Sequence, residues 1–270
     1  MNSYNRLVGQ VAIVTGGSIG IGGAISDKLA REGATVIVAD ITEENAKNKE
    51  AELIQQGYKA EAYLIDVRNT EEIFKMTDYI AQKYTKIDIL VNNAGVQKPC
   101  PSMMLSEEDF DWIMDVNIKA AFFCSQAAGR VMRKNGKGRI VNISSSNSRM
   151  MNVGRAPYCI SKTGIVALTS VLGAEWGIYN IRVNAIAPGW IRTEMVQRGM
   201  DRKAISKEQL LSVIPNQRLG EPSEIADLAC YLVSDEASLI TGHTTYCDGG
   251  YTTGILPNAL DYIRANDVID

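Results

Sequence analysis

The sequence is poor in the side chains that most often bind metal ions. It contains a single histidine, His243, and its five cysteines show no Cys-x-x-Cys or other ligand spacing. Zinc sites are built from clustered Cys and His ligands, so we predict no metal site. His243 stands in a turn before the last predicted strand, where we expect a hydrogen-bonded structural residue and not a catalytic one.

Other absences limit the class of protein. No apolar run reaches the roughly 18 residues of a membrane-spanning helix, and the segment Met1–Arg6 lacks the apolar core of a secretory signal. The formal net charge of −3 gives nucleic-acid binding no support. An odd, scattered set of cysteines suits a reducing compartment. We therefore expect a cytoplasmic protein with no membrane or nucleic-acid partner.

What is present is the composition of an ordinary globular protein. The 270 residues are 46% hydrophobic and 22% charged, enough for a large core. No repeat, low-complexity linker or shift in composition divides the chain. We predict a single domain over residues 1–270.

Short apolar, β-branched runs alternate with helical patterns along the chain, and this alternation predicts the fold class. Strands are expected at residues 11–15, 34–40, 87–91, 138–144 and 180–187, with a third strand ending at 64–67 and a last one after His243. Helices are expected at 43–57, at 70–84 and from Ser106 onward. Such alternation indicates an α/β, doubly wound fold. We expect seven mostly parallel strands with helices on both faces of the sheet.

A glycine-rich segment follows the first strand directly. It reads Gly16-Gly-Ser-Ile-Gly20-Ile-Gly22 and opens an amphipathic helical stretch. Gly16 permits a tight turn, Gly20 lets the backbone approach a pyrophosphate, and Gly22 allows close packing of the helix. The phosphates of a dinucleotide would then lie at the N-terminus of this helix.

The second strand ends in a carboxylate that bears on the choice of cofactor. Asp40 stands eighteen residues after Gly22, where an acid can accept hydrogen bonds from the adenosine ribose. A carboxylate there repels the 2′-phosphate of NADP, and neither Ile19 nor Ile41 supplies a compensating cation. The sequence therefore favours NAD.

Tyr158 and Lys162 form the strongest catalytic signal. At positions i and i+4 of a helix they share a face, so the ammonium can lower the pKa of the phenol. Ser145, thirteen residues before Tyr158, can hydrogen-bond the same reacting oxygen. Hydride transfer at an alcohol carbon needs one such proton carrier and no metal.

Taken together, these motifs resemble the short-chain dehydrogenase/reductase family. The matching residues are Thr15–Gly22, Asp66, Asn92–Gly95, Asn117, Ser145, Tyr158, Lys162 and Pro188–Gly189, within about residues 8–250. The resemblance implies a Rossmann fold and a catalytic tetrad of Asn117, Ser145, Tyr158 and Lys162. By the same resemblance Tyr158 passes a proton to or from the substrate oxygen, and Ser145 orients that oxygen. Lys162 then binds the nicotinamide ribose and lowers the pKa of Tyr158, while Asn117 positions a relay water.

The resemblance also implies a cofactor site and a lid. Asp66 would reach the adenine edge, and Thr193 would hydrogen-bond the nicotinamide carboxamide. The predicted cofactor-binding residues are Gly16, Ser18, Ile19, Gly20, Ile21, Asp40, Ile41, Asp66, Val67, Asn93, Ala94, Gly95, Tyr158, Lys162, Pro188, Gly189, Ile191 and Thr193. Residues 190–218 would form a mobile substrate lid, and residues 251–270 an extension beyond the family's usual end.

The substrate is the least determined part. We predict that it contacts Ser145, Asn147, Arg155, Tyr158 and Trp190. Arg149 and Arg155 flank the interval from Ser145 to Tyr158, and each could clamp an anionic group or serve as a solvated or interface residue. A hydrophilic pocket favours a sugar, polyol or sugar acid. The alternatives are a 3-oxoacyl-acyl-carrier-protein or other ketone reductase, and a non-catalytic NAD-binding redox sensor.

The segment Pro157–Gly177 is apolar on more than one face. A helix that covers one face of a sheet needs only one apolar stripe, so a partner helix could bury the rest. The family commonly forms tetramers through this helix. We therefore predict a homotetramer.

Overall fold

Seven strands of the computed structural model form one sheet in the order β3-β2-β1-β4-β5-β6-β7, and each neighbouring pair is parallel. The structure describes residues 5–201 and 206–254. The strands are β1 Val11–Thr15, β2 Thr35–Asp40, β3 Lys59–Leu64, β4 Ile89–Asn92, β5 Gly138–Ile143, β6 Ile181–Pro188 and β7 Thr244–Cys247. The doubly wound α/β fold is confirmed, and the described sheet is wholly parallel.

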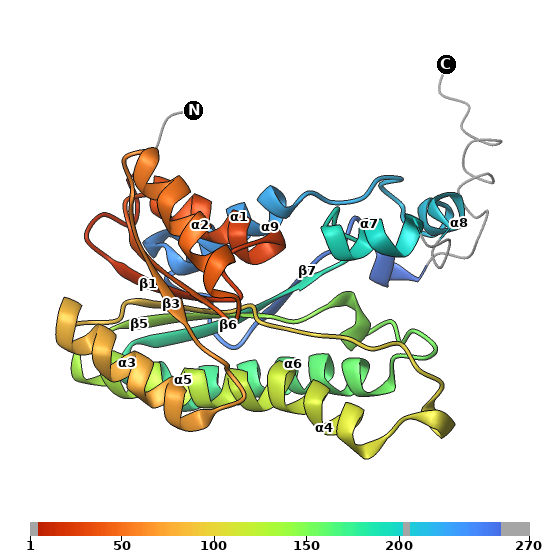
Figure 1. Ribbon diagram of the computed structural model, residues 1–270, viewed down its shortest axis with the longest axis horizontal. Coiled ribbons are helices and arrows are strands. Elements are labelled where there is room, and N and C mark those ends of the chain that lie inside the picture. Colours follow the sequence, from red (N-terminus) through yellow and green to blue (C-terminus); the bar gives the residue numbers. More distant parts are fainter. Residues whose placement is uncertain (1–4, 202–205, 255–270) are drawn as a thin grey trace.

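Helices cover both faces of this sheet (Figure 1). One layer contains α1 Gly20–Arg31, α2 Glu43–Gln55 and α9 Pro222–Val233, and the other contains α3 Thr70–Tyr84, α5 Ala120–Lys134 and α6 Ala156–Trp176. The remaining helices are α4 Glu107–Met114, α7 Glu194–Asp201 and α8 Lys207–Ser212. Short helical turns occur at Ser102–Met104, Ser146–Ser148, Gly177–Tyr179, Asp235–Ala237 and Tyr251–Thr253, and a π-helical segment at Asp115–Lys119.

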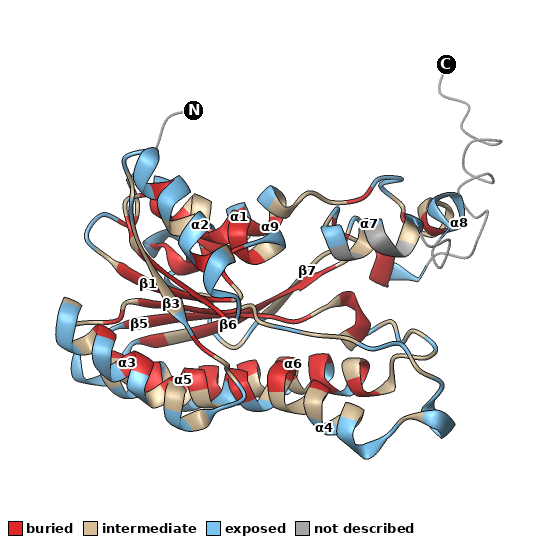
Figure 2. Cartoon of the chain, in the orientation of Figure 1, coloured by how far each residue is buried: buried red, intermediate tan, exposed pale blue. Residues whose placement is uncertain are grey.

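The β-branched strands supply apolar side chains to both layers because successive residues of a strand point to opposite faces. On β1, Ala12 and Val14 join the core under α1 and α9, while Val11 and Ile13 join the core over α3 and α5. Figure 2 shows the buried strands between helices that expose their outer sides. The continuous apolar runs seen in the sequence are therefore two-sided core strands.

The helix predicted from Ser106 is interrupted. Ser106 caps α4 through a hydrogen bond from Asp109 N to its Oγ (3.2 Å), as its position before two glutamates suggested. The chain then forms the π-helical segment Asp115–Lys119 before α5 begins at Ala120. Single π-turns inside helices widen the backbone ladder and often occur at functional sites.

Two predicted regions are only partly described. The predicted lid, residues 190–218, contains α7 and α8, and residues 202–205 lie outside the described part. Of the extension, only 251–254 are described. That the whole of 1–270 forms one domain, and that 190–218 act as a lid, stay predictions. Among the described residues no helix has the length and apolar character needed to cross a membrane.

Candidate active site

The loop between β1 and α1 forms an open cradle. Gly16 has a φ of 59°, the left-handed conformation that favours glycine. The residue before α1, Ile19, makes no side-chain capping bond. The first N–H groups of this helix therefore have no side-chain acceptor, and a helix start of this kind suits a phosphate. This fits the predicted contacts of Gly16, Gly20 and Ile21 with a dinucleotide.

The packing of the glycine-rich loop differs at Gly22 and at Gly20. A Cβ on Gly22 would collide with Gly16 O and with Asn93 Nδ2, so α1 packs directly on the loop and its neighbour. At Gly20 a Cβ would meet only Thr193 Cγ2, at 3.9 Å. The glycine loop thus faces Thr193, and the space between them is large enough for a Cβ. Such a space is expected if a cofactor passes between the loop and Thr193.

Asn93 binds the cradle to the loop after β4. Its Nδ2 donates to Thr15 O (3.0 Å) and Gly16 O (2.9 Å). Thr15 Oγ1 in turn accepts from Asn93 N (3.0 Å) and Ala94 N (3.2 Å). The Asn93 side chain is thus held by protein groups, which fixes the loop, and its predicted contact with a cofactor stays a prediction.

Asp40 is buried at the carboxyl end of β2, with 9% exposure. Its Oδ2 accepts from Ser18 Oγ (2.5 Å), and its Oδ1 accepts from Thr42 N (3.1 Å). Ile19 and Ile41 are largely exposed beside it. The structure therefore places Ser18 and Asp40 in contact, and the two neighbouring isoleucines bring no positive charge to this corner.

Asp66 has an ion-pair partner that the sequence reasoning did not anticipate. Arg68 Nη2 donates to its Oδ2 (2.5 Å) and Arg68 Nε to both oxygens, and these bonds lower the pKa of Asp66. Asp66 lies in the loop after β3, because this strand ends at Leu64. Its predicted contact with adenine stays a prediction.

The loop after β6 packs on the last strand. Pro188 pairs in register with Cys247 of β7, and a Cβ on Gly189 would lie 2.7 Å from the Cα of Asp248. Beyond it Ile191 is buried, and its carbonyl accepts from Thr193 N (2.8 Å). This packing holds Thr193 opposite the glycine loop.

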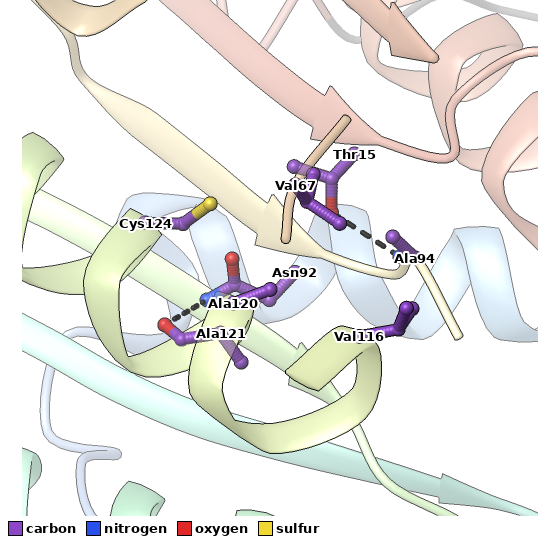
Figure 3. Close-up of a pocket in the computed structure, with 8 residues that line it drawn as sticks. All are labelled: Thr15, Val67, Asn92, Ala94, Val116, Ala120, Ala121 and Cys124. Carbon is purple, nitrogen blue, oxygen red and sulfur yellow. Dashed lines mark hydrogen bonds between the residues drawn. The ribbon is translucent and has the colours of Figure 1, made fainter. Parts of the chain in front are cut away.

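A small cavity lies beside the Asn93–Gly95 loop (Figure 3). Thr15 and Val67 line one side of it, while Val116, Cys124 and two alanines of α5 line the other. Its volume of about 10 Å³ accommodates about one water molecule, far below the roughly 300–1,000 Å³ of ligand pockets. The cavity is therefore not the dinucleotide site, although Val67 was predicted to belong to that site.

Buried amides link the central strands to the catalytic helix. Asn92 and Asn142 lie opposite each other on β4 and β5, and Asn92 Nδ2 donates to Asn142 Oδ1 (2.8 Å). Asn142 Nδ2 then donates to Thr169 Oγ1 of α6 (2.9 Å). Buried side-chain hydrogen bonds of this kind fix the relative position of the elements they join, although Asn92 Oδ1 is left without a partner among the described residues.

Tyr158 and Lys162 come from the first two turns of α6. Lys162 Nζ lies 5.8 Å from the ring centre of Tyr158 and donates to Ile143 O (2.8 Å). Burial lowers the pKa of Lys162 to about 8. Burial also raises the pKa of Tyr158, while a hydrogen bond from Ser145 and the charge of Arg155 lower it. The predicted effect of Lys162 on this phenol stays a prediction.

Asn117 reaches the same place from the π-helical segment. It is 1% exposed, its Oδ1 accepts from Val96 N (2.8 Å), and its Nδ2 donates to Val96 O (2.9 Å) and Ser161 Oγ (3.0 Å). A Cβ on Gly95 would lie 3.4 Å from Lys162 Nζ and 3.5 Å from Asn117 Oδ1. The Asn93–Gly95 loop, which is bound to the glycine-rich loop, thus lies next to the predicted catalytic residues Asn117 and Lys162.

The predicted substrate residues lie around Ser145. Its Oγ accepts from Asn147 N (3.1 Å), and the buried Asn147 Oδ1 accepts from Asn152 Nδ2 (2.8 Å). The Arg155 guanidinium carbon lies 5.6 Å from the centre of the Trp190 ring. Arg149 is exposed and stacks instead on Tyr246 of β7, 5.7 Å from its ring centre.

Sequence reasoning missed the residues that support these side chains. Ser161 holds Asn117, and Ser144 Oγ donates to Lys162 O (2.8 Å). The position of each serine next to a predicted catalytic residue was the available signal. For Asn92 and Asn142 the signal was a polar residue inside an otherwise apolar strand.

Comparison with known proteins agrees with this geometry. Residues 16–252 match the family described as enoyl-(acyl carrier protein) reductase. The chain belongs to the short-chain dehydrogenase/reductase family. It is 40% identical over 247 residues to a 3-oxoacyl-[acyl-carrier-protein] reductase of Thermotoga maritima, covering 91% of this chain and 98% of that protein. It is an oxidoreductase of this family.

Two further members of the family show its range. An NAD-dependent glycerol dehydrogenase of Listeria innocua is 40% identical over 247 residues, covering 92% of this chain and 95% of that protein. A crystal structure from Agrobacterium tumefaciens, of a proposed 2-deoxy-D-gluconate 3-dehydrogenase with bound NADP, superimposes with a TM-score of 0.85 at 34% identity. That match covers 94% of this chain and 100% of the other. The family therefore binds nicotinamide cofactors of both kinds.

The buried ammonium of Lys162 predicts a pH effect on stability. Because its pKa falls from 10.5 to about 8 on folding, the native state binds fewer protons than the unfolded state between these values. The free energy of unfolding should therefore rise with pH across this window, by up to about 3 kcal/mol. Urea unfolding at pH 7.5 and pH 10 measures this rise, which Lys162→Met should lack. Lys59→Met, at an exposed position, is the control, and equal slopes for wild type and Lys162→Met would contradict the prediction.

Proposed function

We propose that the chain is an NAD-dependent dehydrogenase that interconverts a secondary alcohol and a ketone on a sugar, polyol or sugar acid. The observation that carries the proposal is the position of Gly95, where an added Cβ would lie 3.4 Å from Lys162 Nζ and 3.5 Å from Asn117 Oδ1, and which follows Asn93, the residue bound to Gly16. A dinucleotide along the glycine loop would then end beside Tyr158. An oxidoreductase that uses this geometry needs no metal ligand.

The residues around the cradle can hold the cofactor. The free first-turn N–H groups of α1 suit its pyrophosphate, and Asp40 suits the adenosine ribose. Lys162 Nζ, near Gly95, suits the nicotinamide ribose, and Thr193 suits the carboxamide. When bound, the cofactor accepts or supplies the hydride.

The protein's own part is to hold the substrate oxygen and move its proton. Ser145 lies close enough to Tyr158 to lower the pKa of its phenol, so the two hydroxyls can bracket one substrate oxygen. Tyr158 takes the proton of an alcohol or returns it to a ketone. Lys162 provides positive charge beside it, and Asn117, fixed by Val96 and Ser161, holds the relay toward solvent.

The choice of a polar alcohol over a ketoacyl thioester is supported by the surroundings of Ser145. Asn147, Asn152 and Arg155 offer amide and guanidinium groups, which suit hydroxyl and acid groups. The similarity to a glycerol dehydrogenase favours the same class. The similarity to a 3-oxoacyl-[acyl-carrier-protein] reductase favours the alternative, NADPH-dependent ketone reduction. A cytoplasmic location stays a prediction.

Replacement of Tyr158 tests the mechanism. We expect Tyr158→Phe to lower kcat by about 10²–10⁴-fold, since the proton carrier is lost. The dissociation constant for NAD should change by less than about twofold, because the ring remains. Absorbance at the nicotinamide band with a panel of polyols, aldoses and sugar acids measures turnover, with Tyr179→Phe as the matched control. Retained turnover in Tyr158→Phe would refute the assignment, as would wild-type activity only on a ketoacyl thioester with NADPH.

Asp40 should decide the cofactor. Wild type is expected to prefer NAD over NADP by about 100-fold in kcat/KM, because a buried carboxylate repels the extra phosphate. The double variant Asp40→Ser, Ile41→Arg removes that charge and adds a cation at an exposed position, and should remove most of the preference. Ile41→Arg alone serves as the control. A wild-type preference for NADP would show that Asp40 is not the selector.

We further propose a homotetramer built partly through α6. On this helix Ile160 and Val171 are exposed, while Ile165 and Leu172 are buried. Beside it runs an open groove of about 450 Å³, lined by Met114, Asp115, Ile118, Lys119, Phe122, Phe123 and Leu168. An apolar surface of this extent suits a subunit contact.

Sedimentation equilibrium tests this assembly. The wild-type chain should sediment with four times the monomer mass of 29.5 kDa. Val171→Glu should shift it to smaller species, because a charge on the contact loses its solvation. Ile54→Glu, an exposed isoleucine on α2, should leave the mass unchanged. A wild-type monomer would rule the tetramer out.

A further inference from the structure

Arg155 stands between the catalytic helix and the segment that follows β6. It directly precedes α6, three residues before Tyr158, and its side chain is half-buried. Its guanidinium carbon lies 5.6 Å from the ring centre of Trp190. Trp190 belongs to the other segment, where its carbonyl accepts from Gly220 N (2.9 Å). Arg155 therefore joins the start of α6, which carries Tyr158, to the segment after β6.

The charge of Arg155 is not neutralised within the described residues. No carboxylate forms an ion pair with it there, whereas two arginines of the segment after β6 each bind an acid: Arg192 binds Glu221 (2.8 Å) and Arg218 binds Glu224 (2.7 Å). Contact with a ring face holds the guanidinium plane by cation–π attraction, and its N–H edges stay available for bidentate bonds. An arginine held in this way can form two hydrogen bonds to a planar or tetrahedral anion.

The positive charge of Arg155 affects Tyr158, the proposed proton carrier. Burial raises the pKa of Tyr158, and of the groups that oppose that rise Arg155 follows Ser145. Arg155 directly precedes the helix that carries Tyr158, so its guanidinium can reach the far end of a small substrate held at Ser145 and Tyr158. The buried Asn147 donates its backbone N–H to Ser145 Oγ, and its Nδ2 makes no hydrogen bond within the described part of the chain.

From this geometry we propose that Arg155, held on Trp190, binds the anionic group of the substrate, so that the enzyme acts on polyhydroxylated acids or phosphate esters in preference to neutral polyols. The proposal rests on the proposed dehydrogenase function. It narrows the substrate class to molecules with a secondary hydroxyl at Ser145 and Tyr158 and a negative group a few bonds away.

Arg149 provides a matched control. Like Arg155 it lies on an aromatic ring, that of Tyr246, and pairs with no acid among the described residues. Unlike Arg155 it is exposed, and it is not among the groups that shift the pKa of Tyr158. A general attraction of anions to a positive surface would depend on both arginines, whereas a specific clamp would depend on Arg155 alone.

The experiment compares three six-carbon compounds that differ in their charged group: D-gluconate, sorbitol 6-phosphate and sorbitol. KM and kcat are measured with wild type, Arg155→Met, Arg155→Lys and Arg149→Met. We expect Arg155→Met to raise KM for the anionic compounds about 10- to 100-fold, while KM for sorbitol changes by less than about twofold and any fall in kcat, caused by the lost charge near Tyr158, is common to all three compounds. Arg155→Lys should recover part of the loss, because it keeps the charge without the fork. The anion with the lower wild-type KM identifies carboxylate or phosphate as the source.

Calorimetric binding to the NADH-saturated protein separates the two proposals, since it needs no turnover. If no compound is oxidised but the anions still bind tighter than sorbitol through Arg155, the dehydrogenase assignment fails and the anion site stands. If turnover occurs but wild type shows no preference for the anions, the clamp fails alone. Equal weakening of all three compounds in Arg155→Met, or the same loss in Arg149→Met, would also overturn it.

Discussion

The position of α6, the helix that carries Tyr158 and Lys162, depends on the register between β4 and β5. Asn92 and Asn142 face each other only in this parallel alignment, and their hydrogen bond continues to Thr169 in the middle of α6. A slip of one residue would turn these amides to the opposite face and leave them buried without partners. The same register sets Ser145 just beyond β5 and brings Ile143 O to Lys162 Nζ. The register of β4 and β5 therefore fixes both the packing of the core and the geometry of the site.

Sequence reasoning could place most of the strands and the residues of the site because local chemistry determined them. The apolar run of β1, the glycines after it and the i, i+4 spacing of Tyr158 and Lys162 are each readable without tertiary contacts. The break at Asn117 was different: it lies in a π-helical segment, and its side chain pairs with Val96, which is distant in sequence. A local pattern predicts a continuous helix there.

Side-chain partners also lay beyond the reach of the sequence. Asp66 could bind a ligand or a neighbouring cation, and only the loop conformation brings Arg68 to its carboxylate. Arg155 could be solvated or stacked, and only the path of the chain after β6 brings Trp190 beneath it. Such choices depend on distances of a few ångströms between remote segments. The site as described holds its two cations, Lys162 and Arg155, by a carbonyl and a ring instead of carboxylates. Positive charge from Arg155 opposes the rise that burial causes in the pKa of Tyr158.

The central place of β1 in the sheet has a consequence for how the protein is made. β1 pairs with β2 nearby in sequence, but also with β4, where Ala12 lies beside Ile89, 77 residues later. During synthesis the first strand must wait for β4 before its second edge is covered, and the exposed edge can pair wrongly with other chains in that interval. The nucleotide-binding half can then close before α6 has left the ribosome. Nascent chains should thus pass through a stage that holds the glycine-rich loop after β1 without Tyr158.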